Sequence, residues 1–336
     1  MLNISVCIPT YNQSAYLERS IKSAYNQSYQ AMEIIVCDDG STDDSKVVLE
    51  RLKSEIPSLK VFYQSNNLGI SKNVDACLRM ATGDLILRLD SDDLIFPEYL
   101  EKVAKAMMNN PDAGYGHVAI QEIDQYDKLN RIRRLFRSAL YLNGDDALRV
   151  ASKGYRVAAN IVMFRKTALE KVGYITSKLN FAEDWHLSVD IAAAGCGNIY
   201  LDEVLASYRV WDDSGQVRQH RKLAEIMGIT AVFDLALEPA YVARGWSLQE
   251  LEAQRSSLAA VHADCLGWDN YTSIEKKEII KALLKLSSSK KAKTMIWIYC
   301  NGFGNVVQLF SKAKDSLKSL VKKVILSIKS NHQTAS

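Results

Sequence analysis

The chain has 336 residues, of which 48% are hydrophobic and 24% are charged. This length suffices for one large domain or two modest ones, and the composition excludes general disorder. The net charge of +3 excludes a uniformly basic protein, but residues 285–336 hold ten lysines, no arginine and one acid. That segment has a net charge of about +9 and the remainder a net charge of about −6. A basic tail on an acidic body suggests an anionic surface as a partner.

Strand and helix patterns alternate over the first ninety residues. The expected strands cover residues 4–8, 33–37, 59–63 and 85–89, and the expected helices begin at Ser14, Ser41 and Ser71. Pro9 is expected to stop the first strand, and Ser41 with Asp44 forms a capping-box signature. Strands alternating with helices imply a parallel, doubly wound α/β sheet.

The patterns change in the second half of the chain. They weaken between about residues 109 and 180, where we expect continued α+β structure with irregular connections. Residues 183–194 predict a helix that ends at Gly195, and after about residue 213 the pattern becomes mostly helical. We therefore expect an α/β domain over residues 1–215 and a helical region over residues 216–336.

The cysteines and the N-terminus indicate the compartment. Six cysteines occur without a C-x-x-C pair, which argues against a zinc ribbon, and Cys7 and Cys37 lie in apolar runs typical of buried thiols. Such thiols fit a reducing cytosol. The chain enters a strand pattern without the features of a signal peptide, and no run approaches the roughly 20 apolar residues of a membrane span. We expect a cytoplasmic protein.

Polar and acidic residues follow each of the four expected strands. In an open parallel sheet, ligands bind beyond the carboxyl ends of the strands, so these groups would converge on one edge. The four groups are Pro9-Thr10-Tyr11-Asn12, Asp38-Asp39-Gly40-Ser41, Asn66-Asn67-Leu68-Gly69 and Asp90-Ser91-Asp92-Asp93.

The acidic turn at residues 90–93 is the sharpest of these features. Carboxylates crowded into one turn repel each other, and a divalent cation such as Mg²⁺ or Mn²⁺ would relieve that repulsion. The alternative is a solvated acidic turn that caps a helix near Phe96-Pro97. The position directly after an apolar strand favours the metal site.

Two further acidic pairs have competing explanations. Asp38 and Asp39 could belong to a turn with a helix cap at Ser41, yet that cap requires neither carboxylate. Glu183 and Asp184 could simply favour a helix dipole in its first turn. The functional alternative for the second pair is a general base that deprotonates an acceptor hydroxyl.

Taken together, the motifs resemble glycosyltransferase family two, a large inverting family with the GT-A fold. The resemblance covers about residues 3–215, and although each motif alone is weak, their common order and spacing are specific. The matching segments are Val6-Cys7-Ile8-Pro9-Thr10-Tyr11-Asn12, Ile35-Val36-Cys37-Asp38-Asp39-Gly40-Ser41-Thr42-Asp43, Asn67-Leu68-Gly69-Ile70-Ser71-Lys72-Asn73, Ala81-Thr82-Gly83-Asp84, Leu89-Asp90-Ser91-Asp92-Asp93 and Glu183-Asp184-Trp185.

The resemblance implies a role for each matching residue. Asp39 would accept a hydrogen bond from the base, most often uracil, and Asp184 would be the catalytic base. The implied nucleotide-sugar contacts are Pro9, Thr10, Tyr11, Asp39, Lys72, Asp90 and Ser91. The implied metal ligands are Asp92 and Asp90, with Asp93 as a neighbour, and the implied acceptor contacts are Glu183 and Trp185.

The chain departs from the family pattern at two places. Val74 stands where many relatives carry an arginine, and Lys72 is the candidate replacement. Trp211 stands where many relatives carry the histidine of a Tyr-Arg-x-His motif, which puts that contact to metal or diphosphate in doubt. His220 is a more distant substitute.

The resemblance implies a single displacement with inversion at the anomeric carbon, using a UDP-linked donor and a glycan or lipid-linked glycan acceptor in O-antigen or capsule assembly. Two rivals are a nucleotidyltransferase, for which the glycine-rich phosphate loop is missing, and a non-catalytic nucleotide-sugar-binding module.

The basic C-terminal segment predicts a peripheral membrane contact at the inner face of the plasma membrane. Apolar residues recur there at steps of three and four, with lysines at the intervening positions, and an aromatic patch lies upstream at residues 295–299. The alternative is a helix packed on the catalytic domain. A nucleic-acid partner is not expected, because the tail lacks arginine and its aromatic residues do not interleave with the lysines.

Overall fold

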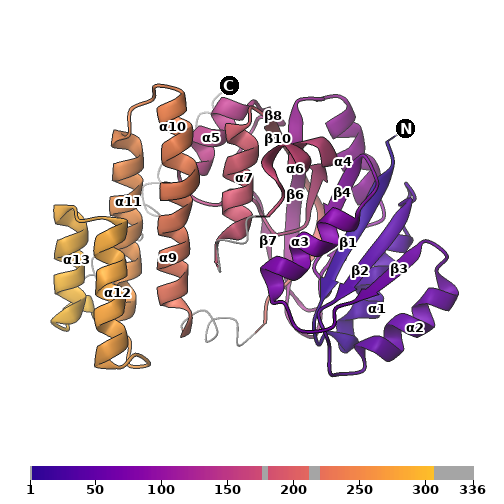
Figure 1. Cartoon of the computed structure of the whole chain (residues 1–336), viewed down its shortest axis with the longest axis horizontal. Coiled ribbons are helices and arrows are strands. Elements are labelled where there is room, and N and C mark those ends of the chain that lie inside the picture. The colour runs from indigo at the N-terminus through magenta and orange to yellow at the C-terminus, as the bar shows by residue number, and fades with distance from the viewer. Residues whose placement is uncertain (1, 176–180, 212–219, 306–336) are drawn as a thin grey trace, which may run out of the picture. The chain divides into compact units, whose positions relative to one another are not determined.

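The computed structural model describes residues 2–175, 181–211 and 220–305 (Figure 1). The chain divides into two compact units, one of residues 1–218 and 227–254, the other of residues 219–226 and 255–336. The first unit therefore includes helical residues beyond position 215, where the sequence analysis ends the α/β domain.

The strands all belong to the first unit. They are β1 (Ile4–Thr10), β2 (Glu33–Asp38), β3 (Leu59–Tyr63), β4 (Leu85–Arg88), β5 (Leu94–Ile95), β6 (Ala113–Ile123), β7 (Leu129–Arg133), β8 (Tyr141–Leu142), β9 (Val162–Arg165) and β10 (Gly197–Arg209).

Helices of the first unit cover this sheet, and further helices form the second unit. They are α1 (Ser14–Tyr25), α2 (Ser45–Glu55), α3 (Ile70–Met80), α4 (Tyr99–Met108), α5 (Gly144–Ala151), α6 (Lys166–Val172), α7 (Glu183–Ala193), α9 (Lys222–Val232), the π-helical η1 (Phe233–Leu237), α10 (Glu238–Ala243), α11 (Gln249–His262), the 3₁₀ segment η2 (Ala263–Gly267), α12 (Ser273–Leu286) and α13 (Lys290–Cys300).

The described strands form one ten-stranded sheet in the order β3-β2-β1-β4-β9-β6-β10-β5, with β7 beside β6 and β8 beside β10. The four N-terminal strands are mutually parallel, and so are β6 and β10. Only β9 interrupts this pattern in the centre, because it runs antiparallel to both β4 and β6. The predicted α/β class is confirmed, with a mixed, mostly parallel sheet.

Each face of the sheet is buried under helices. Alternate residues of the strands point to opposite faces, so Val6 packs with residues of α1, α2 and α4, whereas Cys7 packs with residues of α3, α6 and α7. This double covering explains why the strands read as continuous apolar runs. It also leaves the carboxyl ends of the parallel strands as the edge where polar groups gather.

Three local predictions need correction. The first strand does not stop at Pro9 but runs to Thr10, because β4 pairs with it only as far as Cys7 and the missing N–H of proline costs no ladder bond there. The expected capping box at Ser41 does not form, since α2 begins at Ser45 and Asp44 makes no side-chain cap. The helix expected near Phe96-Pro97 begins at Tyr99, after β5.

The six cysteines all lie within the described residues and are free, with Cys7 and Cys37 buried as predicted. One continuous helical stretch, Lys222–Ala243, is long and apolar enough to cross a membrane by length and composition, which the sequence analysis overlooked. It is 56% buried in its most apolar window, as in a core helix of a folded domain. The predicted amphipathic stripe of residues 310–328 lies outside the described residues.

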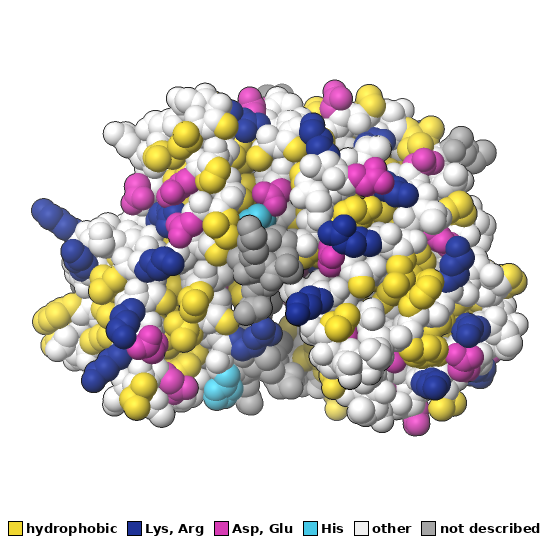
Figure 2. Space-filling view, viewed as in Figure 1, with side chains coloured by type: hydrophobic (Ala, Val, Ile, Leu, Met, Phe, Trp, Pro, Cys, Tyr) yellow, Lys and Arg dark blue, Asp and Glu magenta, His cyan; other side chains and the backbone are white. Residues whose placement is uncertain are grey.

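The second unit is helical. The N-terminus of α12 has a capping box, in which Thr272 and Glu275 bond reciprocally to each other's backbone N–H groups. Ser289 caps α13 with its hydroxyl, which accepts the N–H of Ala292. Acidic and basic side chains are interspersed over the face shown in Figure 2.

Candidate active site

The loops that follow β1, β2 and β3 are joined by hydrogen bonds at the carboxyl edge of the sheet. Asp39 is buried, and its carboxylate accepts the backbone N–H groups of Leu68 (2.8 Å) and Gly69 (3.0 Å). Its own N–H donates to the carbonyl of Thr10 at 2.9 Å. Gly69 has a φ of +83°, a conformation that favours glycine, and this turn aims its N–H at Asp39.

Asp39 therefore orders the loop after β3. Each carboxylate oxygen has a second lone pair, so the predicted hydrogen bond from a nucleotide base is still compatible with this geometry.

A second network holds the start of α1 against the loop after β2. The N–H of Asn12 donates to the Ser41 hydroxyl (2.9 Å), and the Asn12 side chain accepts the N–H of Thr42 (2.8 Å). The Ser41 hydroxyl in turn donates to Asp38. Beside this network lies a hollow lined by residues 12–16, Asp43 and Trp211. Tyr11, one of the predicted nucleotide contacts, is 46% exposed next to it.

The acidic turn after β4 contains three carboxylates in different environments. Asp92 is half-buried, and its pKa is raised by burial and by the negative charge of Asp90. Asp93 is fully buried, its Oδ1 accepts the N–H of Arg209 (2.8 Å), and its Oδ2 has no partner among the described residues. Ser91 is buried between them. Asp93 thus attaches the turn to β10.

Trp211 occupies the position of the family histidine, and it contacts this turn. Its indole N–H donates to Asp92 Oδ2 at 2.8 Å, and its ring packs edge-on against Tyr16 at 5.1 Å. An indole nitrogen is only a donor and cannot ligate a metal. Trp211 therefore orients the carboxylate of Asp92, whereas a histidine there could have shared the ion. His220, the more distant substitute, belongs to the second unit.

Arg209, at the end of β10, connects the acidic turn to the loop that follows β6. Its buried guanidinium donates to the carbonyls of Asp92 (3.0 Å) and Asp124 (2.6 Å) and pairs with Asp127 (2.8 Å). It also lies over the Tyr16 ring at 4.4 Å. Because its N–H groups donate to backbone carbonyls, Arg209 fixes the position of the turn.

Replacing Arg209 with methionine is expected to lower the free energy of unfolding by about 3 kcal/mol, since it leaves the carbonyls of Asp92 and Asp124 without their donor. Urea denaturation measures this loss. Arg19 also pairs with Asp127 but is about half exposed, so Arg19→Met is a matched control with an expected cost below about 1 kcal/mol. Equal costs for the two variants would contradict the bracing role.

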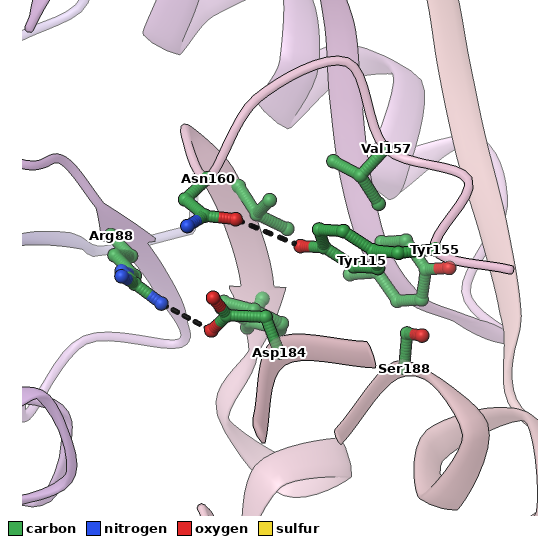
Figure 3. Close-up of a pocket in the computed structure, with 9 residues that line it drawn as sticks. Arg88, Tyr115, Tyr155, Val157, Asn160, Asp184 and Ser188 are labelled. Atoms are coloured by element: carbon green, nitrogen blue, oxygen red, sulfur yellow. Dashed lines mark hydrogen bonds and ion pairs between the residues drawn. The ribbon is translucent and has the colours of Figure 1, made fainter. Parts of the chain in front are cut away.

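Asp184 lies in the first turn of α7, and a buried arginine connects it to the acidic turn. Arg88, the last residue of β4, pairs with Asp184 through Nη1 and with Asp90 through Nε (3.1 Å). Figure 3 shows Arg88 and Asp184 pointing toward each other across one end of a small pocket. Burial raises the pKa of Asp184 to about 6, although the charge of Arg88 lowers it.

Arg88 thus connects the predicted base, Asp184, to Asp90 of the acidic turn. The sequence analysis missed Arg88. The available signal was an arginine inside the otherwise apolar run of residues 85–89, two positions before Asp90.

The other predicted residues lie at different distances from this centre. Glu183 is half-buried and accepts the Ser71 hydroxyl at 2.8 Å, which joins α7 to α3. Lys72 is exposed on α3, and Val74, in the place of the family arginine, is buried in the core. Trp185 is only 5% exposed, because its indole N–H donates to the carbonyl of Ala151 (2.8 Å) and its ring packs on Phe233. Trp185 therefore packs in the core, and its predicted contact with the acceptor stays a prediction.

Comparison with known proteins finds relatives that are named glycosyltransferases. The amylovoran biosynthesis glycosyltransferase AmsE of Erwinia amylovora is 30% identical over 212 residues, covering 62% of this chain and 77% of that protein. A Campylobacter jejuni protein named GalNAc(5)-diNAcBac-PP-undecaprenol beta-1,3-glucosyltransferase is 37% identical over 119 residues, covering 35% of this chain and 37% of the relative. In several curated relatives the matched segment spans less than half of the relative's length.

Among solved structures, S. aureus TarS 1-349 superimposes with a TM-score of 0.63 at 18% identity, covering 89% of this chain and 92% of that one. The mixed sheet with carboxylates at its edge is the GT-A class of fold. The family model for glycosyl transferase family 2 matches residues 5–173. The chain belongs to glycosyl transferase family 2.

Proposed function

We propose that the chain is an inverting glycosyltransferase that moves a sugar from a UDP-linked donor to an acceptor hydroxyl during assembly of a cell-surface polysaccharide such as O-antigen or capsule. The observation that carries this proposal is the ion-pair bridge from Asp184 through Arg88 to Asp90. It joins a candidate base to the acidic turn at one end of a pocket. The relative named for amylovoran biosynthesis supports a polysaccharide pathway. The relative whose name includes PP-undecaprenol supports a lipid-linked acceptor.

Asp184 is the proposed general base. With a pKa of about 6 it is mostly ionised at neutral pH, yet basic enough to accept a proton from an attacking hydroxyl. Arg88 fixes its orientation, and burial keeps water from competing for the carboxylate. A single displacement needs no protein nucleophile, so the remaining residues have only to bind and orient the two substrates.

The donor would lie along the carboxyl edge of the sheet. Pro9, Thr10 and Tyr11 would line its nucleotide, Asp39 would accept from the base, and Ser91 and Asp90 would contact the ribose. Lys72 is exposed on α3 and would reach the base or a phosphate only if it turned toward the ligand.

The acidic turn fits a divalent cation. Burial, and after it the negative charges of the neighbouring carboxylates, raise the pKa values of Asp92 and Asp93, so a positive charge in the turn would stabilise their ionised forms. Within the described residues no group of three or more acids, histidines or cysteines forms a metal site. Mg²⁺ and Mn²⁺ are often held by only one or two carboxylates together with substrate phosphates. We propose Asp92 and Asp90 as those ligands; the ion would act as a Lewis acid on the leaving diphosphate.

The test is a screen of nucleotide sugars with the full chain, with and without Mn²⁺, that measures release of nucleoside diphosphate. Release of UDP from a UDP-sugar, even by slow donor hydrolysis, supports the proposal. Release of pyrophosphate would indicate a nucleotidyltransferase. Nucleotide binding without release from any donor would indicate a binding module and contradict the proposal.

The pH dependence of kcat/KM is expected to have an acidic limb near pH 6. The ionised fraction of Asp184 falls from about 90% at pH 7 to about 10% at pH 5, so the rate should fall about tenfold per pH unit below the limb. Initial rates at acceptor concentrations well below KM would measure it. The residual activity of Asp184→Asn should lack this limb. If the limb persists in that variant, another group such as Asp92 is responsible.

For location, we propose a cytoplasmic protein that contacts the inner face of the plasma membrane through its lysine-rich C-terminus. The ten lysines of residues 285–336 support this proposal. Co-sedimentation of the full chain with anionic vesicles at low salt, lost in a chain that ends at residue 288, is the expected result. Binding that is unchanged by the truncation would contradict it.

A further inference from the structure

A groove lies in the first unit beside the pocket that holds Asp184. It is lined by the connection from β7 to β8, by α5, and by single residues of α7 and β10. Its volume of about 530 Å³ lies within the range of small-molecule sites, roughly 300–1,000 Å³.

The groove is strongly basic. Four cations line it, Arg134, Arg137, Lys153 and Arg156, and its lining includes neither Asp nor Glu. Arg134 pairs with Asp202 at 2.8 Å. For the other three, the described part of the chain offers no carboxylate within ion-pair distance. A concave surface with cations of one sign concentrates anions.

Arg137 gives the groove a fixed charge. It is half-buried, and its N–H groups donate to the carbonyls of Ala139 (2.7 Å), Leu140 (2.9 Å) and Asn198 (3.0 Å). These contacts satisfy its donors but leave its positive charge without a counter-ion. Burying a charge without a counter-ion is costly, and an anion bound in the groove would offset that cost.

Arg156 and Lys153 have donors available for a ligand. Both are exposed, and the one hydrogen bond found for the Arg156 guanidinium is a 3.2 Å contact with the carbonyl of Lys153. A guanidinium has five N–H donors in a fork that matches two phosphate oxygens. Phe136, also in the lining, is fully exposed and offers an apolar surface beside the cations.

The groove and the Asp184 pocket share two lining residues, Tyr115 and Ser188. Figure 3 shows both of them in the pocket together with Asp184. A ligand in the groove would thus lie against the two side chains that also border the pocket of the candidate base. The geometry fits the second substrate better than the donor, whose diphosphate is expected at Asp92.

We propose that this groove binds a phosphate or diphosphate group of the acceptor, so that the enzyme uses a phosphate-bearing acceptor. The inference rests on the proposed glycosyltransferase function. The phosphate could belong to a lipid diphosphate carrier or to a water-soluble phosphorylated glycan. Both present the same chemistry to Arg156 and Lys153. Only the lipid carrier would also use the apolar surface of Phe136.

The test measures binding of inorganic pyrophosphate and of geranyl diphosphate to the full chain by calorimetry, in EDTA so that neither binds through a metal at Asp92. The variant is Lys153→Gln combined with Arg156→Gln. Arg131→Gln is the matched control, because Arg131 is exposed on β7, pairs with Glu122 and does not line the groove.

The expected result is pyrophosphate binding that weakens at least tenfold in the double variant and stays unchanged in the control. Tighter binding of geranyl diphosphate, lost in Phe136→Ala, would identify a lipid carrier; equal binding of the two probes would identify a soluble acceptor. Failure of the wild type to bind pyrophosphate, or equal binding by the double variant, would overturn the inference. Donor hydrolysis is also measured on the double variant. It needs no acceptor, so it tests the glycosyltransferase proposal independently of the groove.

Discussion

Asp184→Asn is expected to lower kcat by about 10²- to 10⁴-fold, the usual contribution of a general base. The amide keeps the size of the side chain and can still accept from Arg88 Nη1, but it cannot take the acceptor's proton. The affinity for UDP should change little, because Asp184 contacts the acidic turn only through Arg88. Steady-state rates and UDP binding by calorimetry, measured on the same preparation, separate the two effects.

Glu183→Gln is the matched control for that variant. Glu183 is the adjacent acid on α7, and the Ser71 hydroxyl already donates to its carboxylate. Its substitution should reduce kcat less than about tenfold, as expected for the loss of one hydrogen bond. A large loss in Glu183→Gln with near-normal turnover in Asp184→Asn would move the base by one residue. Retention of configuration at the anomeric carbon would rule out single displacement with either residue.

Asp92→Asn should reduce turnover by about 10²-fold or more, because a metal ligand supplies several kcal/mol of stabilisation to the leaving diphosphate. The asparagine oxygen can still accept the Trp211 indole N–H, so the local structure should persist. Activity of the wild type should vanish in EDTA and return with Mn²⁺ or Mg²⁺. Circular dichroism of the variant verifies that it remains folded.

Trp211→Phe tests how much the hydrogen bond to Asp92 contributes, apart from the charge of Asp92. This variant removes the 2.8 Å bond to Asp92 and keeps both the aromatic packing on Tyr16 and the negative charge. A lost hydrogen bond is worth about 0.5–1.5 kcal/mol, so activity should fall by about tenfold or less. Full activity of Asp92→Asn in chelator would rule out the metal role, whatever the behaviour of Trp211→Phe.

Hydrophobic patterns in the sequence predicted the bounds of helices and strands well where apolar residues recur at a regular interval. The third strand, residues 59–63, has the bounds of β3, α3 begins one residue before its predicted start at Ser71, and α7 ends one residue before its predicted end. Predictions from single side chains were weaker. Ser41 matched a capping box, yet its hydroxyl donates to Asp38, since a short polar side chain has several nearby partners and the sequence does not rank them.

The sequence by itself determined the α/β class, the polar edge of the sheet and the acidic turn after β4. Strand spacing and the rule that parallel strands share a carboxyl edge require only local information. Family resemblance added Asp184, but no periodicity connected it to the turn.

Only the tertiary structure decided which of these groups meet. Arg88 reaches Asp184 across 96 residues of sequence, because β4 and the start of α7 border the same pocket. The same packing turned Trp185 into the core, set the indole of Trp211 on Asp92, and brought Tyr115, Ser188 and Asn198 to the groove whose cations all come from residues 134–156. Contacts of this kind depend on how elements pack in three dimensions, and residue order alone does not fix them.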